Sequence, residues 1–219
     1  MGFGRDQWHG ASTCRVGWRD VVVSLFRPAR RILLDAFLTS TLLVTVAEIG
    51  DKTMLLAIVL ASRFRKPLPI IAGILVATLA NHALAALVGH TAASWLESSA
   101  FQIAVALSFI AMGLWTLVPD KLDDDGEPRA HGGVFLTTAV AFFLVEMGDK
   151  TQIATVALGA QFNSVLLVTA GTTAGMMLAN IPAVLLGDAL VRRISLKTVR
   201  IIAAACFVAA GIWMLVGAL

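Results

Sequence analysis

Two stretches of the chain, Glu48-Ile49-Gly50-Asp51-Lys52-Thr53 and Glu146-Met147-Gly148-Asp149-Lys150-Thr151, are copies of one acidic motif. Each copy lies in the middle of a long apolar segment, where charged side chains are rare. A charged side chain at the centre of a membrane helix costs about 2.5–3.5 kcal/mol on insertion scales. Each copy carries two carboxylates and a lysine, which indicates a functional site because ordinary helix packing does not require them.

The composition around the motifs is that of a membrane protein. The 219 residues are 58% hydrophobic and only 14% charged, with a mean hydropathy of +0.84, whereas soluble domains carry about 25% charged residues. The pI is 9.2, but the basic residues lie in the N-terminal stretch and in short loops, a pattern typical of membrane orientation rather than of nucleic-acid binding. Cys14 and Cys206 are far apart and lack metal or redox spacing, so no disulfide framework is expected.

Six segments are long and apolar enough to cross a membrane as helices, which takes about 20 residues each. They are Ala36–Ser62, Leu68–Gly89, Ala100–Val118, Val134–Ala160, Ser164–Gly187 and Thr198–Leu219. The predicted organisation is an N-terminal basic extension (1–35), a first three-helix repeat (36–118), an acidic linker (119–133) and a second three-helix repeat (134–219).

The two halves are copies of each other, offset by 98 residues. The offset pairs Glu48 with Glu146, and it also pairs Gly73 with Gly171, Gly89 with Gly187, Phe109 with Phe207, Gly113 with Gly211 and Trp115 with Trp213. The triplets ending in Asn81 and Asn180 match with one residue of drift. Three spans per half is an odd number, so the second half enters the membrane from the opposite side. The predicted fold class is an all-α integral membrane protein with six transmembrane helices as two inverted three-helix repeats.

The basic loop residues predict an orientation for these spans. Loops one, three and five carry Arg63, Arg65 and Lys66, Lys121 and Arg129, and Arg192, Arg193 and Lys197. By the positive-inside rule these loops are cytoplasmic and both ends of the six-span core are outside. Arg27, Arg30 and Arg31 favour the opposite orientation. Residues 1–35 fit a signal peptide poorly and are interpreted as a basic surface segment, or as an extension from a mistaken start codon.

The four acidic residues of the motifs are the predicted cation-binding and metal residues: Glu48, Asp51, Glu146 and Asp149. Within each motif the two acids are three residues apart, which places them on one face of a continuous helix. Four carboxylates that converge repel each other unless a cation or protons neutralise them, which is the basis of exchange. Carboxylate, hydroxyl and amide oxygens suit hard cations such as Ca²⁺ and Mn²⁺.

Neighbouring residues are predicted to support this site. Neutral oxygens come from Thr53, Thr151, Gln152, Asn81 and Asn180, while Gly50 and Gly148 loosen the helix and expose backbone carbonyls. Lys52 and Lys150 allow two interpretations, an inert ion pair with the neighbouring aspartate or a tether that holds a carboxylate between metal-bound states. His82 has no counterpart under the drifted match, and a packing or hydrogen-bonding role is favoured for it.

A doubled Glu-x-Gly-Asp-Lys-Thr motif in a six-span chain resembles the uncharacterised protein family 0016, which includes transmembrane protein 165, Gdt-one-like proteins and MneA-type manganese exporters. The resemblance covers residues 36–219, and both motif copies match without substitution. It implies a Mn²⁺ or Ca²⁺ transporter that exchanges the cation for protons. It also implies that Glu48, Asp51, Glu146 and Asp149 form the centre of the site.

The expected function is therefore export of a divalent cation from the cytoplasm in exchange for protons, with Mn²⁺ as the first candidate cation and Ca²⁺ as the second. The expected location is the bacterial inner membrane, with the cation and the lipid bilayer as partners, no cofactor and no nucleic acid. Alternatives within transport are a Ca²⁺/H⁺ exchanger and a channel-like cation permease. An intramembrane aspartyl protease is the alternative from another class, but those proteases carry Gly-x-Gly-Asp, and Glu48 and Glu146 replace the first glycine. No enzyme activity is expected, and the oligomeric state is left open.

Overall fold

The computed structural model describes residues 29–95, 99–118, 132–187 and 195–218. Most of the predicted N-terminal extension (1–28) and of the predicted acidic linker (119–131) lies outside the described residues. Residues Leu33–Leu219 form one compact unit, and of the unit Met1–Ile32 only the beginning of helix α2 is described.

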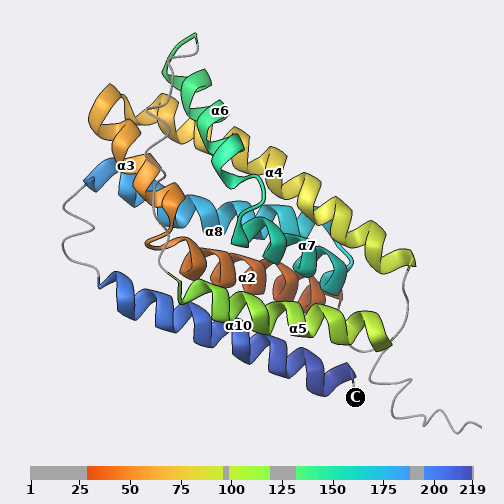
Figure 1. Cartoon of the computed structure of the whole chain (residues 1–219). Coiled ribbons are helices and arrows are strands. Elements are labelled where there is room, and N and C mark those ends of the chain that lie inside the picture. The colour runs from red at the N-terminus through yellow and green to blue at the C-terminus, as the bar shows by residue number, and fades with distance from the viewer. Residues whose placement is uncertain (1–28, 96–98, 119–131, 188–194, 219) are drawn as a thin grey trace, which may run out of the picture. The chain divides into compact units, whose positions relative to one another are not determined.

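All the regular elements of the described residues are α-helices (Figure 1). Their bounds are α2 (Ala29–Glu48), α3 (Lys52–Phe64), α4 (Pro67–Trp95), α5 (Ser99–Thr116), α6 (Val134–Glu146), α7 (Lys150–Phe162), α8 (Val165–Leu186) and α10 (Leu196–Ala218). Four of them, α4, α5, α8 and α10, are long and apolar enough to cross a membrane, and α6 is a shorter apolar helix. The prediction of an all-α membrane protein is confirmed.

The predicted first and fourth spans are not continuous helices, so that part of the prediction is wrong. The segment Ala36–Ser62 is divided between α2 and α3, and Val134–Ala160 is divided between α6 and α7. Gly50 has φ 88° and Gly148 has φ 81°, values in the left-handed region where only glycine avoids a steric penalty. The motif glycines therefore do more than loosen the helix, because each one ends it.

Glycines also bring helices of the two halves into backbone contact. A Cβ atom placed on Gly73 of α4 would lie 2.8 Å from the carbonyl oxygen of Phe135 in α6. A Cβ atom on Gly171 of α8 would lie 2.6 Å from the carbonyl oxygen of Phe37 in α2. The 98-residue offset relates the members of the first contact to those of the second, so the two contacts are reciprocal.

Helices α5 and α10 lie side by side and pack in the same reciprocal way (Figure 1). A Cβ atom on Gly113 would meet Val208 Cγ2 at 2.7 Å, and one on Gly211 would meet Ile110 Cγ1 at 2.7 Å. The rings of Phe109 and Phe207, which are themselves related by the offset, have centroids 6.0 Å apart. Residues that contact their own repeat counterparts lie near the axis of any rotation that superposes the two halves.

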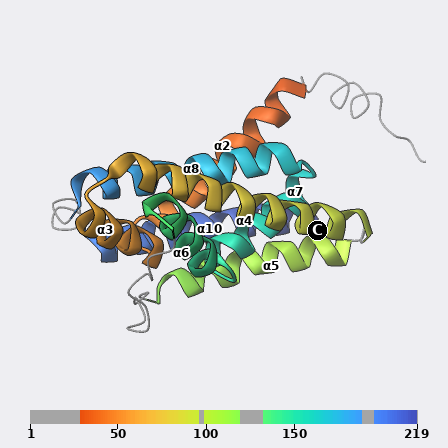
Figure 2. The same ribbon diagram turned by 90° about the horizontal axis from the view of Figure 1, so that it is seen from above.

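The buried apolar side chains form two clusters that share α8. One joins α3, α4, α6 and the C-terminal half of α8, and it includes Leu60, Ile70 and Phe142. The other joins α2, α5, α7, α10 and the N-terminal half of α8. It includes Leu158 and Val168, the repeat counterparts of Leu60 and Ile70. Helix α4 runs beside α8 and contributes to both clusters (Figure 2).

Candidate metal site

The two acidic motifs lie at the two helix breaks and have nearly the same local geometry. Asp51 has φ −81° and ψ 170°, and Asp149 has φ −78° and ψ 168°. The backbone N–H of Asp51 donates to the carbonyl of Glu48 at 3.0 Å, and that of Asp149 donates to the carbonyl of Glu146 at 3.1 Å. The prediction that each glutamate and aspartate share one helix face is therefore wrong, since the glutamate ends one helix and the aspartate precedes the next.

Each motif threonine holds the glutamate of its own motif across the break. The hydroxyl of Thr53 donates to Glu48 Oε2, and the hydroxyl of Thr151 donates to Glu146 Oε1. Both threonines and both glutamates are almost fully buried. The threonines thus position the glutamate carboxylates beside the first turn of the following helix.

The lysine of each motif pairs with the aspartate of the other motif. Lys150 Nζ lies 3.4 Å from Asp51 Oδ1, and Lys52 Nζ lies 3.4 Å from Asp149 Oδ1. The sequence considered only ion pairs between neighbours within a motif, whereas these two pairs join the halves of the chain. The lysines differ in burial, because the side chain of Lys150 is 7% exposed and that of Lys52 is 27% exposed.

Three of the four predicted carboxylates come together. One oxygen each of Glu48, Asp51 and Asp149 lies within 4.8 Å of the other two, and all three residues are buried. Helices α3 and α7 begin directly after the two aspartates. The N-terminus of a helix carries roughly half a positive charge, so both half-helices favour negative charge at this point.

The fourth carboxylate, Glu146, lies outside this group of three and approaches a histidine instead. Its Oε1 atom is 3.7 Å from Nε2 of His82 in α4, and both side chains are almost fully buried. Neither ring nitrogen of His82 has a hydrogen-bond partner among the described residues. His82, for which a packing or hydrogen-bonding role is favoured, therefore lies beside Glu146, one of the predicted site residues.

The helix register gives His82 a counterpart that the sequence comparison missed. Gly73 and Gly89 in α4 have the same spacing as Gly171 in α8 and Gly187 directly after it. Both helices are continuous between these positions. With equal spacing, Asn180 occupies the place in α8 that His82 occupies in α4. A match of Asn180 to Asn81 would require one extra residue, which turns a helix by about 100°, and no such insertion is present in these helices.

The two asparagines are buried and use only their amide nitrogens. Asn81 Nδ2 donates to the carbonyl of Phe143 in α6 at 3.0 Å, and Asn180 Nδ2 donates to the carbonyl of Met176 at 3.1 Å. In the described part of the chain neither Oδ1 atom accepts a hydrogen bond. Both amide oxygens therefore retain the capacity to bind a proton donor or a cation.

Gln152 has a local role in the structure. Its Oε1 atom accepts a hydrogen bond from the backbone N–H of Gly148. This contact ties the first turn of α7 to the positive-φ glycine that precedes it. The amide oxygen that the sequence offered to the cation is thus used at the helix break.

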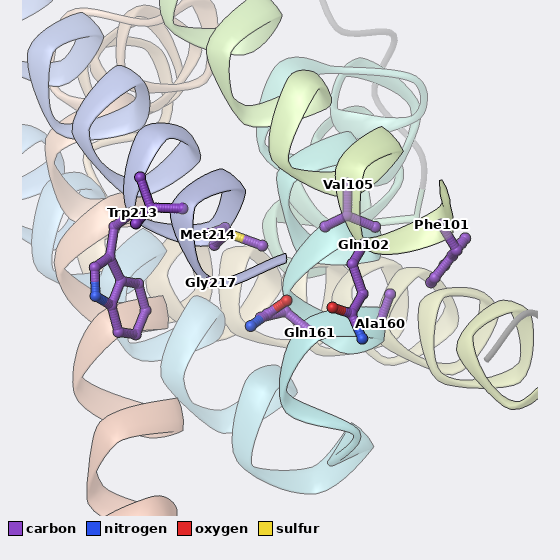
Figure 3. A pocket seen from close by; sticks show the side chains of 9 residues that line it. Phe101, Gln102, Val105, Ala160, Gln161, Trp213, Met214 and Gly217 are labelled. Carbon is purple, nitrogen blue, oxygen red and sulfur yellow. The ribbon is translucent and has the colours of Figure 1, made fainter. Parts of the chain in front are cut away.

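A cavity of about 430 Å³ lies among α5, α7 and α10 (Figure 3). The side chains of Gln102 and Gln161 project into it, and Phe101, Trp213 and Met214 supply apolar walls. It contains none of the predicted site residues. The 98-residue offset pairs Gln102 with Arg200 and Gln161 with Arg63. The repeat counterparts of these two neutral side chains are therefore positively charged.

The model of one protein family, Divalent cation/proton antiporter GDT1, matches residues 36–124 and 134–219. The chain belongs to the GDT1 family. One acidic motif lies in each matched part, and residues 1–35 fall outside the match. The family is one of divalent cation/proton antiporters, so the chain is a multi-pass membrane transporter and not an enzyme.

Several GDT1 relatives align with most of the chain. A Vibrio cholerae protein named "Putative manganese exporter" is 50% identical over 165 residues, which cover 75% of this chain and 82% of that protein. A GDT1-like protein of Synechocystis is 31% identical over 196 residues, covering 80% of the chain and 94% of the relative. GDT1-like protein 5 of Arabidopsis thaliana is 29% identical over 218 residues, which cover 82% of this chain and 95% of that protein. No solved structure matches the chain.

Proposed function

We propose that this GDT1 protein exports Mn²⁺ in exchange for protons and binds the cation at the two helix breaks. Glu48, Asp51 and Asp149 supply the first carboxylate oxygens, and Glu146 completes the acidic set. The observation that carries the proposal is the buried meeting of carboxylates from both motifs at the N-termini of two half-helices. Secondary transporters commonly bind ions at such interrupted helices.

The spacing of the three carboxylates suits a single cation. Ca²⁺ binds oxygen at about 2.3–2.6 Å, so two ligand oxygens on opposite sides of the ion lie about 5 Å apart. The oxygens of Glu48, Asp51 and Asp149 lie within 4.8 Å of one another. Carboxylate oxygens also suit Mn²⁺. The unused Oδ1 atoms of Asn81 and Asn180 are available as neutral ligands.

The charges of the site support exchange with protons. Four motif carboxylates and two motif lysines, with His82 counted as neutral, leave a net charge of −2. One divalent cation or two protons neutralise that charge, and a buried site strongly disfavours an uncompensated charge. The site is therefore stable with either occupant and unstable when empty, which couples the two fluxes.

We assign the motif lysines the tethering role. Each lysine holds the aspartate of the other half at 3.4 Å. A cation that binds between Asp51 and Asp149 competes with these ammonium groups for the same oxygens, and the lysines take the oxygens back when the cation leaves. The alternative, an inert pair between neighbours in sequence, has no support in these distances.

We propose that α2 with α3, and α6 with α7, each complete one membrane crossing, which gives six spans in two inverted repeats. The repeats are 36–118 and 134–219, joined by the acidic linker 119–133. Contacts that occur twice, once in each direction between the halves, support this arrangement. They are the close helix contacts at Gly73 and at its counterpart Gly171, those at Gly113 and at its counterpart Gly211, and the two lysine–aspartate pairs. Arg63, Arg65, Lys66 and Lys197 are exposed and favour a cytoplasmic position for the loops that follow α3 and precede α10.

Manganese is proposed as the main substrate because the similar Vibrio cholerae protein is named as a manganese exporter. Ca²⁺ accepts the same oxygen ligands, so Ca²⁺/H⁺ exchange is the alternative within the family chemistry. A channel-like permease is disfavoured because all four motif carboxylates are buried rather than lining an open pore.

Flux into proteoliposomes tests the proposal directly. With an imposed pH gradient, the purified protein should move Mn²⁺ against its concentration gradient, and Glu48→Gln or Asp149→Asn should lower the rate at least 100-fold. Asp35→Asn is the matched control, since Asp35 is an exposed acid on α2, and it should keep the wild-type rate. Wild-type vesicles that move no divalent cation in response to the pH gradient would refute the proposal.

A further inference from the structure

The two repeat-related helix interfaces differ in polarity. Helix α2 packs on α8 through Gly171 and Gly175, and a Cβ atom on Gly175 would lie 2.6 Å from the carbonyl oxygen of Thr41. Besides Thr39, six hydroxyl-bearing side chains lie in the C-terminal half of α2 and the N-terminal half of α8. We name these six the hydroxyl stripe: Ser40, Thr41, Thr45, Thr169, Thr172 and Thr173. Their repeat counterparts on α6 and α4 carry one hydroxyl only: Thr138, Ala139, Phe143, Ile71, Ile74 and Leu75.

Three hydroxyls of the stripe bond to their own helix. Thr41 donates to the carbonyl of Phe37 at 2.8 Å, Thr45 to that of Thr41 at 2.7 Å, and Thr172 to that of Val168 at 2.8 Å. Such bonds satisfy the hydroxyl proton, and the oxygen keeps its lone pairs for another donor.

The other three hydroxyls, Ser40, Thr169 and Thr173, are buried and have no hydrogen-bond partner within the described ranges. A buried hydroxyl without a partner is destabilising, because it loses its hydrogen bonds to water and gains none in the protein. Buried water usually satisfies such groups and makes about three hydrogen bonds to them. The arrangement of donors and acceptors along the stripe therefore suits a row of water molecules.

The hydroxyl stripe runs along the axes of α2 and α8 over a distance close to half the thickness of a membrane. Phe37 packs beside Gly171 and Thr41 beside Gly175, so α2 and α8 run parallel here. Ser40 precedes Glu48 by eight residues, about 12 Å of helix, and Thr169 precedes Asn180 by eleven residues, about 16 Å. The hydrocarbon core is about 30 Å thick, so the stripe leads from one membrane face to Glu48 and Asn180 near its middle.

We infer that the hydroxyl stripe lines a water passage that carries protons between the extracytoplasmic face and the carboxylate cluster. The inference rests on the proton exchange proposed above. The face is assigned because Arg65, in the basic loop after α3, lies beside Val184 and Leu185 at the C-terminal end of α8. Helix α8 therefore begins at the end of the bundle opposite this loop, and the positive-inside rule places the loop in the cytoplasm. On the cytoplasmic side the equivalent positions hold Ile71, Ile74 and Phe143, whose side chains offer no partner to water.

Thiol accessibility tests the passage with a matched pair of variants. Thr172 and Ile74 are related by the repeat and both are fully buried. In full-length protein with Cys14 and Cys206 replaced by serine, T172C should react with Ag⁺ added from the extracytoplasmic side at least tenfold faster than I74C reacts from either side. Equal rates, or no reaction of T172C, would overturn the inference.

Proton-driven Mn²⁺ exchange provides a second test. The double variant T169V/T173V removes two unpartnered hydroxyls while keeping side-chain shape, and T138V removes the buried hydroxyl at the counterpart of Ser40. We expect T169V/T173V to lower the exchange rate at least tenfold with unchanged Mn²⁺ affinity by calorimetry, and T138V to leave both within twofold.

The outcomes separate the passage from the proposed function. A wild-type exchange rate in T169V/T173V would overturn the passage alone, and so would a parallel loss of Mn²⁺ affinity, which would assign the hydroxyls to the cation site. Absence of proton-coupled Mn²⁺ flux in the wild-type protein would instead refute the proposed function.

Discussion

Lys150 and Asp51 come from different copies of one motif, 99 positions apart in sequence, and form a buried ion pair with Nζ and Oδ1 3.4 Å apart. The repeat counterpart of this pair, Lys52 with Asp149, has the same distance of 3.4 Å between Nζ and Oδ1. The charges of each half are therefore compensated by the other half, and neither motif is electrostatically complete by itself.

Lys150→Met should destabilise the cation-free protein more than Lys52→Met does. Removing one partner of a buried pair costs about 3–5 kcal/mol, and exposed pairs contribute at most about 1 kcal/mol. Lys150 is the more buried lysine, with 7% of its side chain exposed against 27% for Lys52. Thermal unfolding in detergent measures this, and Mn²⁺ should restore more stability to Lys150→Met than to the wild type. Equal destabilisation of the two variants would contradict the prediction.

Gly148→Ala should destabilise the protein by about 1–2 kcal/mol through backbone conformation alone. Gly148 has φ 81°, and a Cβ atom there would meet nothing within 4 Å. Gly217→Ala is the control, because its Cβ atom would also meet nothing within 4 Å and the residue is helical. We expect Gly217→Ala to keep the wild-type melting temperature and Gly148→Ala to lower both melting temperature and exchange rate. A Gly148→Ala protein as stable as the control would show that the left-handed turn is dispensable.

His82→Asn should preserve Mn²⁺ exchange within about threefold, whereas His82→Leu should lower it at least tenfold. The reason is that Asn180 occupies the equivalent position of α8, so an amide is compatible with this place in the fold, and Asn keeps a polar side chain on the side of α4 that approaches Glu146. Initial rates in proteoliposomes provide the measurement, with protein folding checked by gel filtration. Full activity of His82→Leu would mean that Glu146 needs no polar neighbour at this position.

Transport should exchange two protons for each divalent cation and carry no net charge. The motif carboxylates and lysines leave a charge of −2, which two protons or one divalent cation neutralise. The measurement is the pH gradient at which Mn²⁺ flux reverses, with and without an imposed membrane potential. A reversal point that shifts with the membrane potential would rule out this stoichiometry.

The sequence predicted the helical class and four of the long helices, because hydropathy is a local property. The transport role of the motif residues stays a prediction. It did not predict the breaks at Gly50 and Gly148, since a glycine in an apolar run is compatible with both a helix and a turn. Nor could it pair Lys150 with Asp51, because the pairing depends on how distant segments pack. The drifted match of the asparagines hid the equivalence of His82 and Asn180, which equal glycine spacing in α4 and α8 would have revealed.

Gly113 of α5 packs against Val208, and Gly211 of α10 packs against Ile110, so the two helices meet as matching subunits do in a homodimer. Two identical subunits would be obliged to present the same residues to both sides of the membrane. Gene fusion removes that obligation, so threonine at 172 can coexist with isoleucine at 74 and asparagine at 180 with histidine at 82. In the inverted arrangement proposed above, such differences are the means by which the two directions of transport can differ.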